Sequence, residues 1–317
     1  FGGYGDYYNG GQDTNAITYL TLANKLIHQV NPKAITIAEE MSGMPGLAIK
    51  FADGGIGFDY RMAMGIPDYW IKTLKEKKDE DWHPTSIFWE LTNRRYEEKT
   101  ISYVESHDQA LVGDKTVIFR LIDKAKLLGA SMLRHDASSG FVTDRKFGLS
   151  YADALPRLAE GCRKISEYGK SVGIKTMTEN HGYFSQDADR VEALINAVAC
   201  DNFGALIDLG NFMCADEDPT VSVGKLARYA FHTHAKDFLY KPGTLPFPGD
   251  GWFRTRAGNF LRGTIIGHGE AKIWQSLGIL KRSGYNGWLS VEFEGLEDNL
   301  TGIKMGLDNL KRLYETA

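Results

Sequence analysis

Short β-type runs alternate with longer helical patterns along this chain, and the alternation restricts the fold more than any other sequence feature. Strand, helix and strand in succession are typical of parallel sheets with crossover helices. Eight segments carry the strand pattern: 34–38, 57–60, 101–104, 131–135, 174–178, 204–207, 229–233 and 288–291. Because eight parallel strands close a (β/α) barrel, the sequence predicts an α/β protein with the (β/α)8 TIM-barrel fold.

Helical periodicity fills most of the intervals between these strands. In the segment 17–30, apolar side chains recur with the helical period. Further helices are predicted at 66–78, 86–98, 151–172, 187–199, 271–283 and 299–315. The segment 236–270 is the exception, because it is rich in Gly, Pro and aromatic residues and shows no clear period. It follows a strand, so in a barrel it would overhang the C-terminal face, where active sites lie.

Composition and charge narrow the classes of function. The net charge of −4 and the pI near 6.1 provide no positive field for a phosphate backbone, so nucleic acid is not expected as a partner. We found no apolar run long enough to span a bilayer, and three scattered cysteines favour a reducing compartment. We therefore expect a cytoplasmic protein that acts on a small molecule. The sequence leaves its oligomeric state open.

Residues that can hold a metal or move a proton follow each apolar strand from about residue 123 onward. They are His135, Asp136, Glu179, His181, Asp208, Asn211, His234, Asp237 and Glu292. Any one of them alone is as well explained as a cap, an ion-pair partner or a core histidine. In a closed barrel, however, all the strand ends meet on one rim, where the carboxylates would repel one another unless a cation neutralised them. The succession of strand ends therefore predicts a divalent metal site.

A set of sequence blocks in this half carries a family resemblance: TMTENHG at 176–182, LIDLGNF at 206–212, FHTHAKD at 231–237, IGHGE at 266–270 and GYNGWLSVEFEG at 284–295. Over residues 123–317, the chain resembles the xylose-isomerase-like sugar (phosphate) isomerase/epimerase family of TIM barrels. The matching part corresponds to roughly the last five strands of that family's barrel.

The resemblance implies one divalent ion held by Glu179, Asp208, His234 and Glu292. Three carboxylates and one imidazole suit Mn²⁺ or Mg²⁺, with Co²⁺ or Zn²⁺ as alternatives. The resemblance further implies that the catalytic acid–base pair is Glu179 and Glu292. Candidates for contact with the substrate are His181, Asn211, Lys236 and, in the IGHGE turn, His268.

These residue types suit proton transfer beside a carbonyl group. A sugar or sugar phosphate bound to the metal through a carbonyl and its neighbouring hydroxyl would lose the adjacent C–H proton to one glutamate, through a metal-stabilised enediolate. Return of the proton by the other glutamate on the opposite face gives epimerisation. Return by the same group to the adjacent carbon gives ketose–aldose isomerisation.

The N-terminal part carries a different set of motifs, which include AITIAEEMSGMPG at 34–46, GGIGFDYRMAM at 54–64 and LTNRRYEEKTISYVESHDQALVGDK at 91–115. Residues 1–121 resemble the α-glucan (glycogen) branching enzymes of the α-amylase superfamily. The resemblance implies Glu39 as general acid/base and His107 and Asp108 as sugar contacts. That chemistry also requires a carboxylate nucleophile, which the family supplies from a strand preceding this segment. We therefore expect Glu39, His107 and Asp108 to be vestigial.

The two resemblances meet near residues 119–126, within a continuous helical pattern. Three strands from one family and five from the other make eight, so we expect 1–317 to form a single hybrid barrel from segments 1–121 and 122–317. The chimera is either engineered or an artefact of gene assembly. Three other functions remain open: a folded scaffold without turnover, an α-glucan branching transglycosylase, and a phosphodiesterase of the endonuclease IV type. The last is disfavoured by the acidic charge and by too few histidines for a three-metal cluster.

Overall fold

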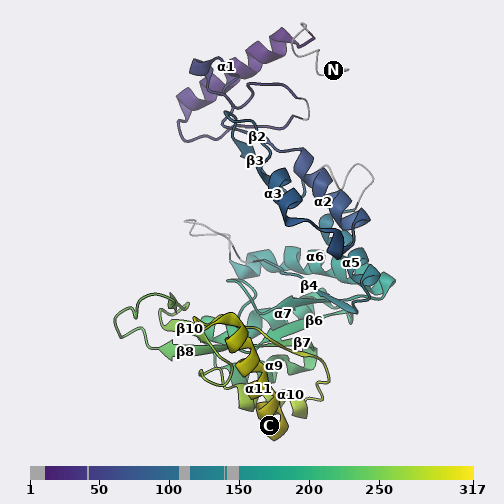
Figure 1. The fold of residues 1–317 in the computed structure, drawn as a ribbon, viewed down its shortest axis with the longest axis vertical. Coiled ribbons are helices and arrows are strands. Elements are labelled where there is room, and N and C mark those ends of the chain that lie inside the picture. The colour runs from purple at the N-terminus through teal and green to yellow at the C-terminus, as the bar shows by residue number, and fades with distance from the viewer. Residues whose placement is uncertain (1–10, 41–42, 107–114, 139, 141–149) are drawn as a thin grey trace. The chain divides into compact units, whose positions relative to one another are not determined.

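The computed structural model describes residues 11–317 except 41–42, 107–114, 139 and 141–149 (Figure 1). The chain divides into two compact units, Phe1–Lys124 and Ala125–Ala317. The division falls within helix α5 (Val117–Leu127), in the stretch where the two sequence resemblances meet. The two units are therefore described separately.

The N-terminal unit contains a short parallel sheet in the order β1-β2-β3, formed by Ile37–Ala38, Tyr60–Met62 and Thr100–Ile101. Its helices are α1 (Thr14–Val30), α2 (Gly65–Glu76) and α3 (Pro84–Thr92), with two 3-10 turns, η2 (Phe51–Asp53) and η3 (Asp79–Asp81). Asp13 begins α1, because its carboxylate accepts the otherwise unpaired amides of Asn15 and Ala16.

A small apolar cluster and a buried ion pair hold this unit together. Ala38, Leu47 and Ile56 form the cluster. Glu98, which is 4% exposed, accepts hydrogen bonds from the backbone of Gly46 and Ala48 and from the Arg61 guanidinium. Helix α3 ends at Thr92, short of the predicted 98, and this leaves Glu98 in a turn where its carboxylate can reach these donors.

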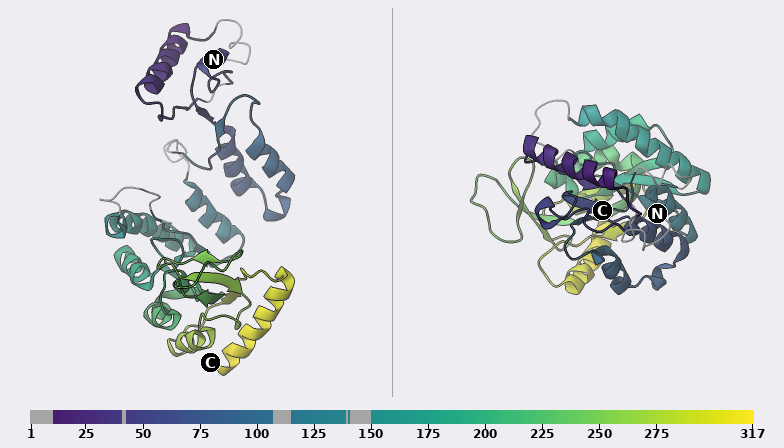
Figure 2. Two further views of the ribbon diagram at one scale, coloured as in Figure 1. Left: turned by 90° about the vertical axis from the view of Figure 1, so that its left-hand side faces the viewer. Right: turned by 90° about the horizontal axis from the view of Figure 1, so that it is seen from above.

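The C-terminal unit is built on a parallel sheet of five strands in the order β11-β7-β6-β5-β4. The strands are β4 (Met132–Arg134), β5 (Lys175–Glu179), β6 (Phe203–Asp208), β7 (Ala230–Ala235) and β11 (Leu289–Val291). Its longer helices are arranged in an arc outside the sheet: α6 (Tyr151–Val172), α7 (Ala188–Val198), α9 (Pro219–Leu226), α10 (Ile273–Arg282) and α11 (Asn299–Thr316) (Figure 2). Two shorter helical segments are α8 (Asn211–Cys214) and η4 (Ala227–Tyr229).

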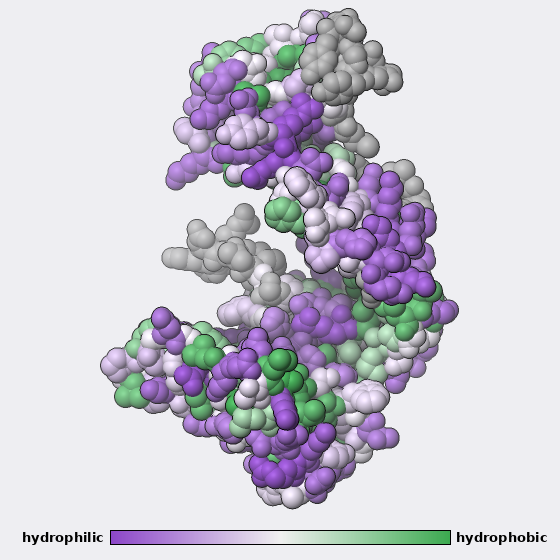
Figure 3. Space-filling view, in the orientation of Figure 1, coloured by the Kyte–Doolittle hydropathy of each residue, from purple (hydrophilic) through white to green (hydrophobic). Residues whose placement is uncertain are grey.

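The main core lies between this sheet and its helices. Leu194 of α7, Ile207 of β6 and Leu277 of α10 have no exposed surface. At α11 the covering is partial, since Leu300 is 80% exposed and Ile303 45% exposed. Hydrophobic side chains accordingly appear on the surface near this helix (Figure 3). None of the helices in the described ranges has both the length and the apolar character required to cross a bilayer.

The long segment 236–270 differs from the loop expected from the sequence. It folds into an antiparallel sheet in the order β8-β10-β9, with strands Asp237–Lys241, Phe260–Thr264 and Phe253–Arg254. These strands are short and are separated by stretches rich in Gly and Pro, so the sequence shows no clear period of two. Asp216, at a φ of 60°, anchors this sheet by accepting hydrogen bonds from Thr255 and Asn259.

All eight predicted strands overlap strands of the structure, and the strand pairs that they form are parallel. The α/β class with parallel strands is therefore confirmed. The formation of one hybrid barrel by 1–317 stays a prediction.

Candidate metal centre

Four strands of the larger sheet bring four ligand-type residues together. Glu179 and Asp208 are the last residues of β5 and β6, His234 lies near the end of β7, and Glu292 directly follows β11. Strand register aligns them, because Asp208 pairs with His234, and Val291, next to Glu292, pairs with Ala235. One potential ligand atom from each of the four residues lies within 4.8 Å of the other three. The predicted set is thus assembled as a cluster that can hold a metal ion.

The His234 imidazole lies between the three carboxylates. Its Nδ1 is 2.8 Å from Glu292 Oε2, 3.8 Å from Glu179 Oε1 and 4.0 Å from Asp208 Oδ2. Burial acts to lower the pKa of His234, but the hydrogen bond to Glu292 and the neighbouring carboxylates raise it above its ordinary value. The hydrogen bond from His234 also lowers the pKa of Glu292. In this arrangement a protonated His234 would offset part of the negative charge of the three carboxylates.

Asp208 is the most enclosed member of the cluster and has no exposed surface. Its Oδ1 accepts the amides of Gly210 and Asn211 at 2.8 Å each, whereas the buried Oδ2 has no hydrogen-bond partner. Burial raises the pKa of Asp208 to about 8. A buried carboxylate oxygen without a hydrogen-bond partner, close to two other carboxylates and an imidazole, fits a hard divalent cation, which would satisfy it.

Two further residues predicted at the site, Asn211 and Lys236, lie directly against the ligands. Asn211 Nδ2 donates to Glu179 Oε1 at 3.2 Å, and its Oδ1 accepts from Lys236 Nζ at 3.3 Å. The Lys236 ammonium, which is 3% exposed, is 3.1 Å from Glu292 Oε1 and 3.7 Å from Asp208 Oδ2. The surrounding carboxylates raise the pKa of Lys236 despite its burial. The lysine therefore acts as a built-in counter-ion to the carboxylates.

Sequence reasoning missed two charged residues at this rim. Arg134, the last residue of β4, places Nη2 at 2.7 Å from Glu179 Oε2 and 2.9 Å from Asp136 Oδ1. Glu294 accepts from Lys236 Nζ at 3.1 Å. Like the four clustered residues, both lie at the ends of predicted strands, 131–135 and 288–291. This position could have marked them in the sequence as candidates for the site.

The remaining residues predicted for the site do not contact the four clustered side chains in the described structure. His181 and His268 are exposed, and their contacts within the described chain are backbone hydrogen bonds. A substrate contact for either residue remains a prediction. Asp237 instead has a structural role, because its buried carboxylate accepts the amides of Gly267, Gly269 and Ala271 and so holds the IGHGE turn.

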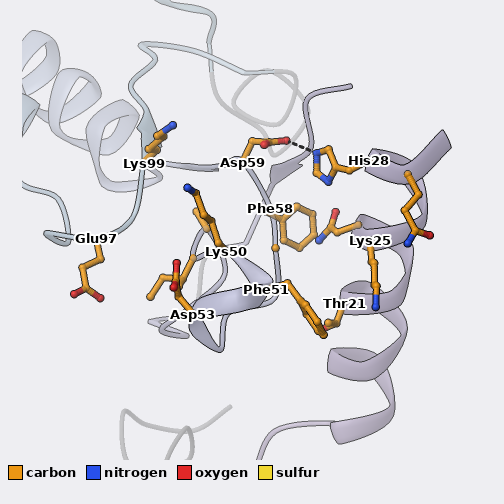
Figure 4. Close-up of a pocket in the computed structure, with 15 residues that line it drawn as sticks. Thr21, Lys25, His28, Lys50, Phe51, Asp53, Phe58, Asp59, Glu97 and Lys99 are labelled. Atoms are coloured by element: carbon orange, nitrogen blue, oxygen red, sulfur yellow. Dashed lines mark hydrogen bonds and ion pairs between the residues drawn. The ribbon is translucent and has the colours of Figure 1, made fainter. Parts of the chain in front are cut away.

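In the N-terminal unit, Glu39 is exposed directly after β1. His107 and Asp108 lie outside the described residues. A cavity of about 900 Å³ lies at the opposite, N-terminal ends of β2 and β3. In it, His28 Nε2 is 2.9 Å from Asp59 Oδ2, and Lys25, Lys50 and Lys99 line the walls (Figure 4). The cavity is therefore separate from the end of the sheet that carries Glu39.

A parallel sheet covered by helices, with candidate ligands at the carboxyl ends of its strands, is typical of α/β proteins, (β/α) barrels among them. A family model described as "Xylose isomerase-like TIM barrel" matches residues 106–313. The chain belongs to this family, which confirms the predicted TIM-barrel fold class and the C-terminal resemblance. The match begins at 106, earlier than the segment boundary expected from the sequence.

Solved structures support the same fold. The "IOLI protein with a binding zinc atom" is 18% identical, with a TM-score of 0.52 over 82% of this chain and 89% of that protein. A "Xylose isomerase-like TIM barrel Protein" from Mycobacterium smegmatis in complex with magnesium is 17% identical, with a TM-score of 0.50 over 89% of this chain and 97% of that protein.

Curated relatives match part of the chain. A 1,4-alpha-glucan-branching enzyme from Rhizophagus irregularis is 58% identical over 123 residues, which are 39% of this chain and 18% of that enzyme. The same enzyme from Felis catus is 55% identical over 132 residues, or 42% and 19% respectively. This chain thus spans less than a fifth of the length of these relatives. The branching-enzyme resemblance is confirmed over part of the chain.

Proposed function

We propose that the C-terminal unit is a metal-dependent sugar or sugar phosphate isomerase/epimerase site, with one divalent ion held by Glu179, Asp208, His234 and Glu292. The observation that carries the proposal is the cluster itself, in which four ligand atoms lie within 4.8 Å and the buried Asp208 Oδ2 has no hydrogen-bond partner. The oxygen-rich donor set favours Mn²⁺ or Mg²⁺, with Co²⁺ or Zn²⁺ as alternatives.

The proposed chemistry is proton transfer beside a ketose carbonyl. A divalent ion in the site would polarise the carbonyl of a bound sugar and make the neighbouring C–H more acidic. Glu179 and Glu292 come from β5 and from the end of β11, on opposite sides of β6 and β7 in the sheet order. This separation suits two bases that act on opposite faces of a small substrate.

Among the comparisons, "Structure of L-ribulose 3-epimerase" is 16% identical, with a TM-score of 0.50 over 63% of this chain and 66% of that protein. At this identity the likeness concerns the fold. The assignment to sugar chemistry therefore depends on the cluster, with family membership in support.

The proposal is tested by hydrogen exchange with solvent. Ketoses and ketose phosphates are incubated with Mn²⁺-loaded protein in D₂O, and deuterium uptake beside the carbonyl is followed by NMR. We expect uptake that a chelator abolishes and that Glu179→Gln or Glu292→Gln lowers by ~10²-fold or more. Glu39→Gln and Glu160→Gln, at exposed glutamates outside the cluster, are matched controls and should leave the rate unchanged. Loss of exchange in Glu39→Gln, with the fold intact, would instead make the N-terminal rim catalytic.

The high identity to branching enzymes supports a second candidate, a chimeric scaffold that binds metal without turnover. Tight Mn²⁺ binding with no exchange on any tested ketose would favour this alternative. α-Glucan transfer is a third, weaker candidate, and a change in iodine-stained amylose would reveal it.

A further inference from the structure

The two oxygens of the Glu179 carboxylate have different partners. Oε1 faces the cluster, 3.8 Å from His234 Nδ1, and accepts the Asn211 amide at 3.2 Å. Oε2 is 2.7 Å from Arg134 Nη2. With its side chain 5% exposed, Glu179 has little access to water that could replace either partner. Oε1 is therefore the oxygen directed at the other clustered residues, while Oε2 is paired with the Arg134 guanidinium.

Arg134 comes from β4, the edge strand, which contributes none of the four clustered residues. Its guanidinium is fixed from two sides, because Nη2 is also 2.9 Å from Asp136 Oδ1. The Arg134 side chain remains 36% exposed, in contrast to the buried ammonium of Lys236 at 3%. The described site thus contains two cationic side chains. Lys236 is enclosed beside Asp208 and Glu292, and the more accessible Arg134 restrains a single oxygen of Glu179.

We propose that Arg134 is a positioning residue that limits Glu179 to one metal-binding oxygen and thereby selects the ion. This inference depends on the proposed metal site. Ca²⁺ takes about 6–8 oxygen ligands and commonly uses both oxygens of a carboxylate, whereas Mg²⁺ requires a compact octahedron. With Oε2 held by Arg134, the cluster offers too few protein oxygens for Ca²⁺ and suits the smaller ions.

The ratio of two affinities isolates this geometric effect. A guanidinium repels any divalent ion, so the loss of its charge alone changes the affinities for Mn²⁺ and Ca²⁺ in parallel. Freeing Oε2 favours only the ion that can use a second carboxylate oxygen. The measurement is therefore the Ca²⁺/Mn²⁺ ratio of dissociation constants, from EPR titration of free Mn²⁺ with Ca²⁺ as competitor.

We expect Arg134→Gln to lower the Ca²⁺/Mn²⁺ ratio of dissociation constants ~10-fold or more, the size of effect seen when a residue behind a metal ligand is changed. Arg134→Lys keeps a cation near Oε2 and should stay closer to the parent ratio. Arg282→Gln, an exposed arginine at the end of α10, is the matched control and should leave the ratio unchanged.

An Arg134→Gln ratio within ~2-fold of the parent would overturn the inference while leaving the metal site standing. If the parent protein binds neither ion, both the metal site and this inference are wrong. If Arg134→Gln does not fold, Arg134→Met takes its place, because it keeps the apolar stem and removes the guanidinium from Glu179 Oε2. A parent-like ratio in Arg134→Met would then overturn the proposal.

Discussion

Asp208 combines complete burial with a raised pKa. Burial raises its pKa from 3.8 to about 8, so the folded chain holds a proton that the unfolded chain releases above its own, lower pKa. The stabilising effect of this proton is complete at low pH and is lost as pH rises through the folded pKa.

We therefore expect ion binding near neutral pH to release a proton from Asp208, and Mn²⁺ affinity to rise between about pH 6 and pH 8. Calorimetry in buffers of different ionisation enthalpy measures the proton release. Asp208→Asn should reduce the release to the part that comes from His234, whose pKa is also raised, and should weaken Mn²⁺ binding. An affinity that does not change with pH would contradict the assignment of Asp208 as a ligand.

His234 contributes the only imidazole of the cluster formed by the described residues. Replacing it by alanine removes one ligand and should lower Mn²⁺ affinity ~10-fold or more. His28→Ala, in the N-terminal unit, is the matched control. Calorimetric titration of both variants provides the measurement, and Mn²⁺ binding by His234→Ala as tight as in the parent would show that His234 is not a ligand.

At the scale of elements, the parallel strands were predictable from their apolar runs, each followed by a polar side chain. The four clustered residues were among these strand-end residues, and the family resemblance implied that particular set. Arg134 was missed because an arginine at a strand end is usually solvated, and only the distance to Glu179 shows its partner. The β8-β10-β9 sheet was missed because its pairing is set by contacts distant in sequence, such as Asp216 with Thr255.

The turn after β10 allows a prediction about stability that does not depend on the proposed catalytic activity. Asp237→Asn replaces an oxygen that accepts backbone amides with an NH₂ group that cannot accept them, so it should lower the free energy of unfolding by about 1–3 kcal/mol. Asp250→Asn, at an exposed position in the same segment, is the control. Thermal unfolding of both variants measures the difference. Equal melting temperatures for Asp237→Asn and the parent would contradict a structural role for this carboxylate.

For the whole molecule, we propose that 1–317 forms one hybrid barrel. Sheets of three and five strands each have open edges, and a barrel removes its edges only by closing. A single cooperative unfolding transition is expected, and the isolated fragment 122–317 should be insoluble or should bind metal weakly. Calorimetry and Mn²⁺ titration of the full chain and the fragment provide the measurements. Two separate transitions, or a folded fragment with full metal affinity, would show that the halves are independent.

The enclosed ammonium of Lys236 bears on the order in which the protein folds and binds a metal ion. Because this internal charge already offsets part of the negative charge of the carboxylates, we expect the polypeptide to fold before a metal ion binds. We then expect metal binding to follow folding and to be reversible. Among the ions that the site accepts, the ion bound would depend on which of them are available.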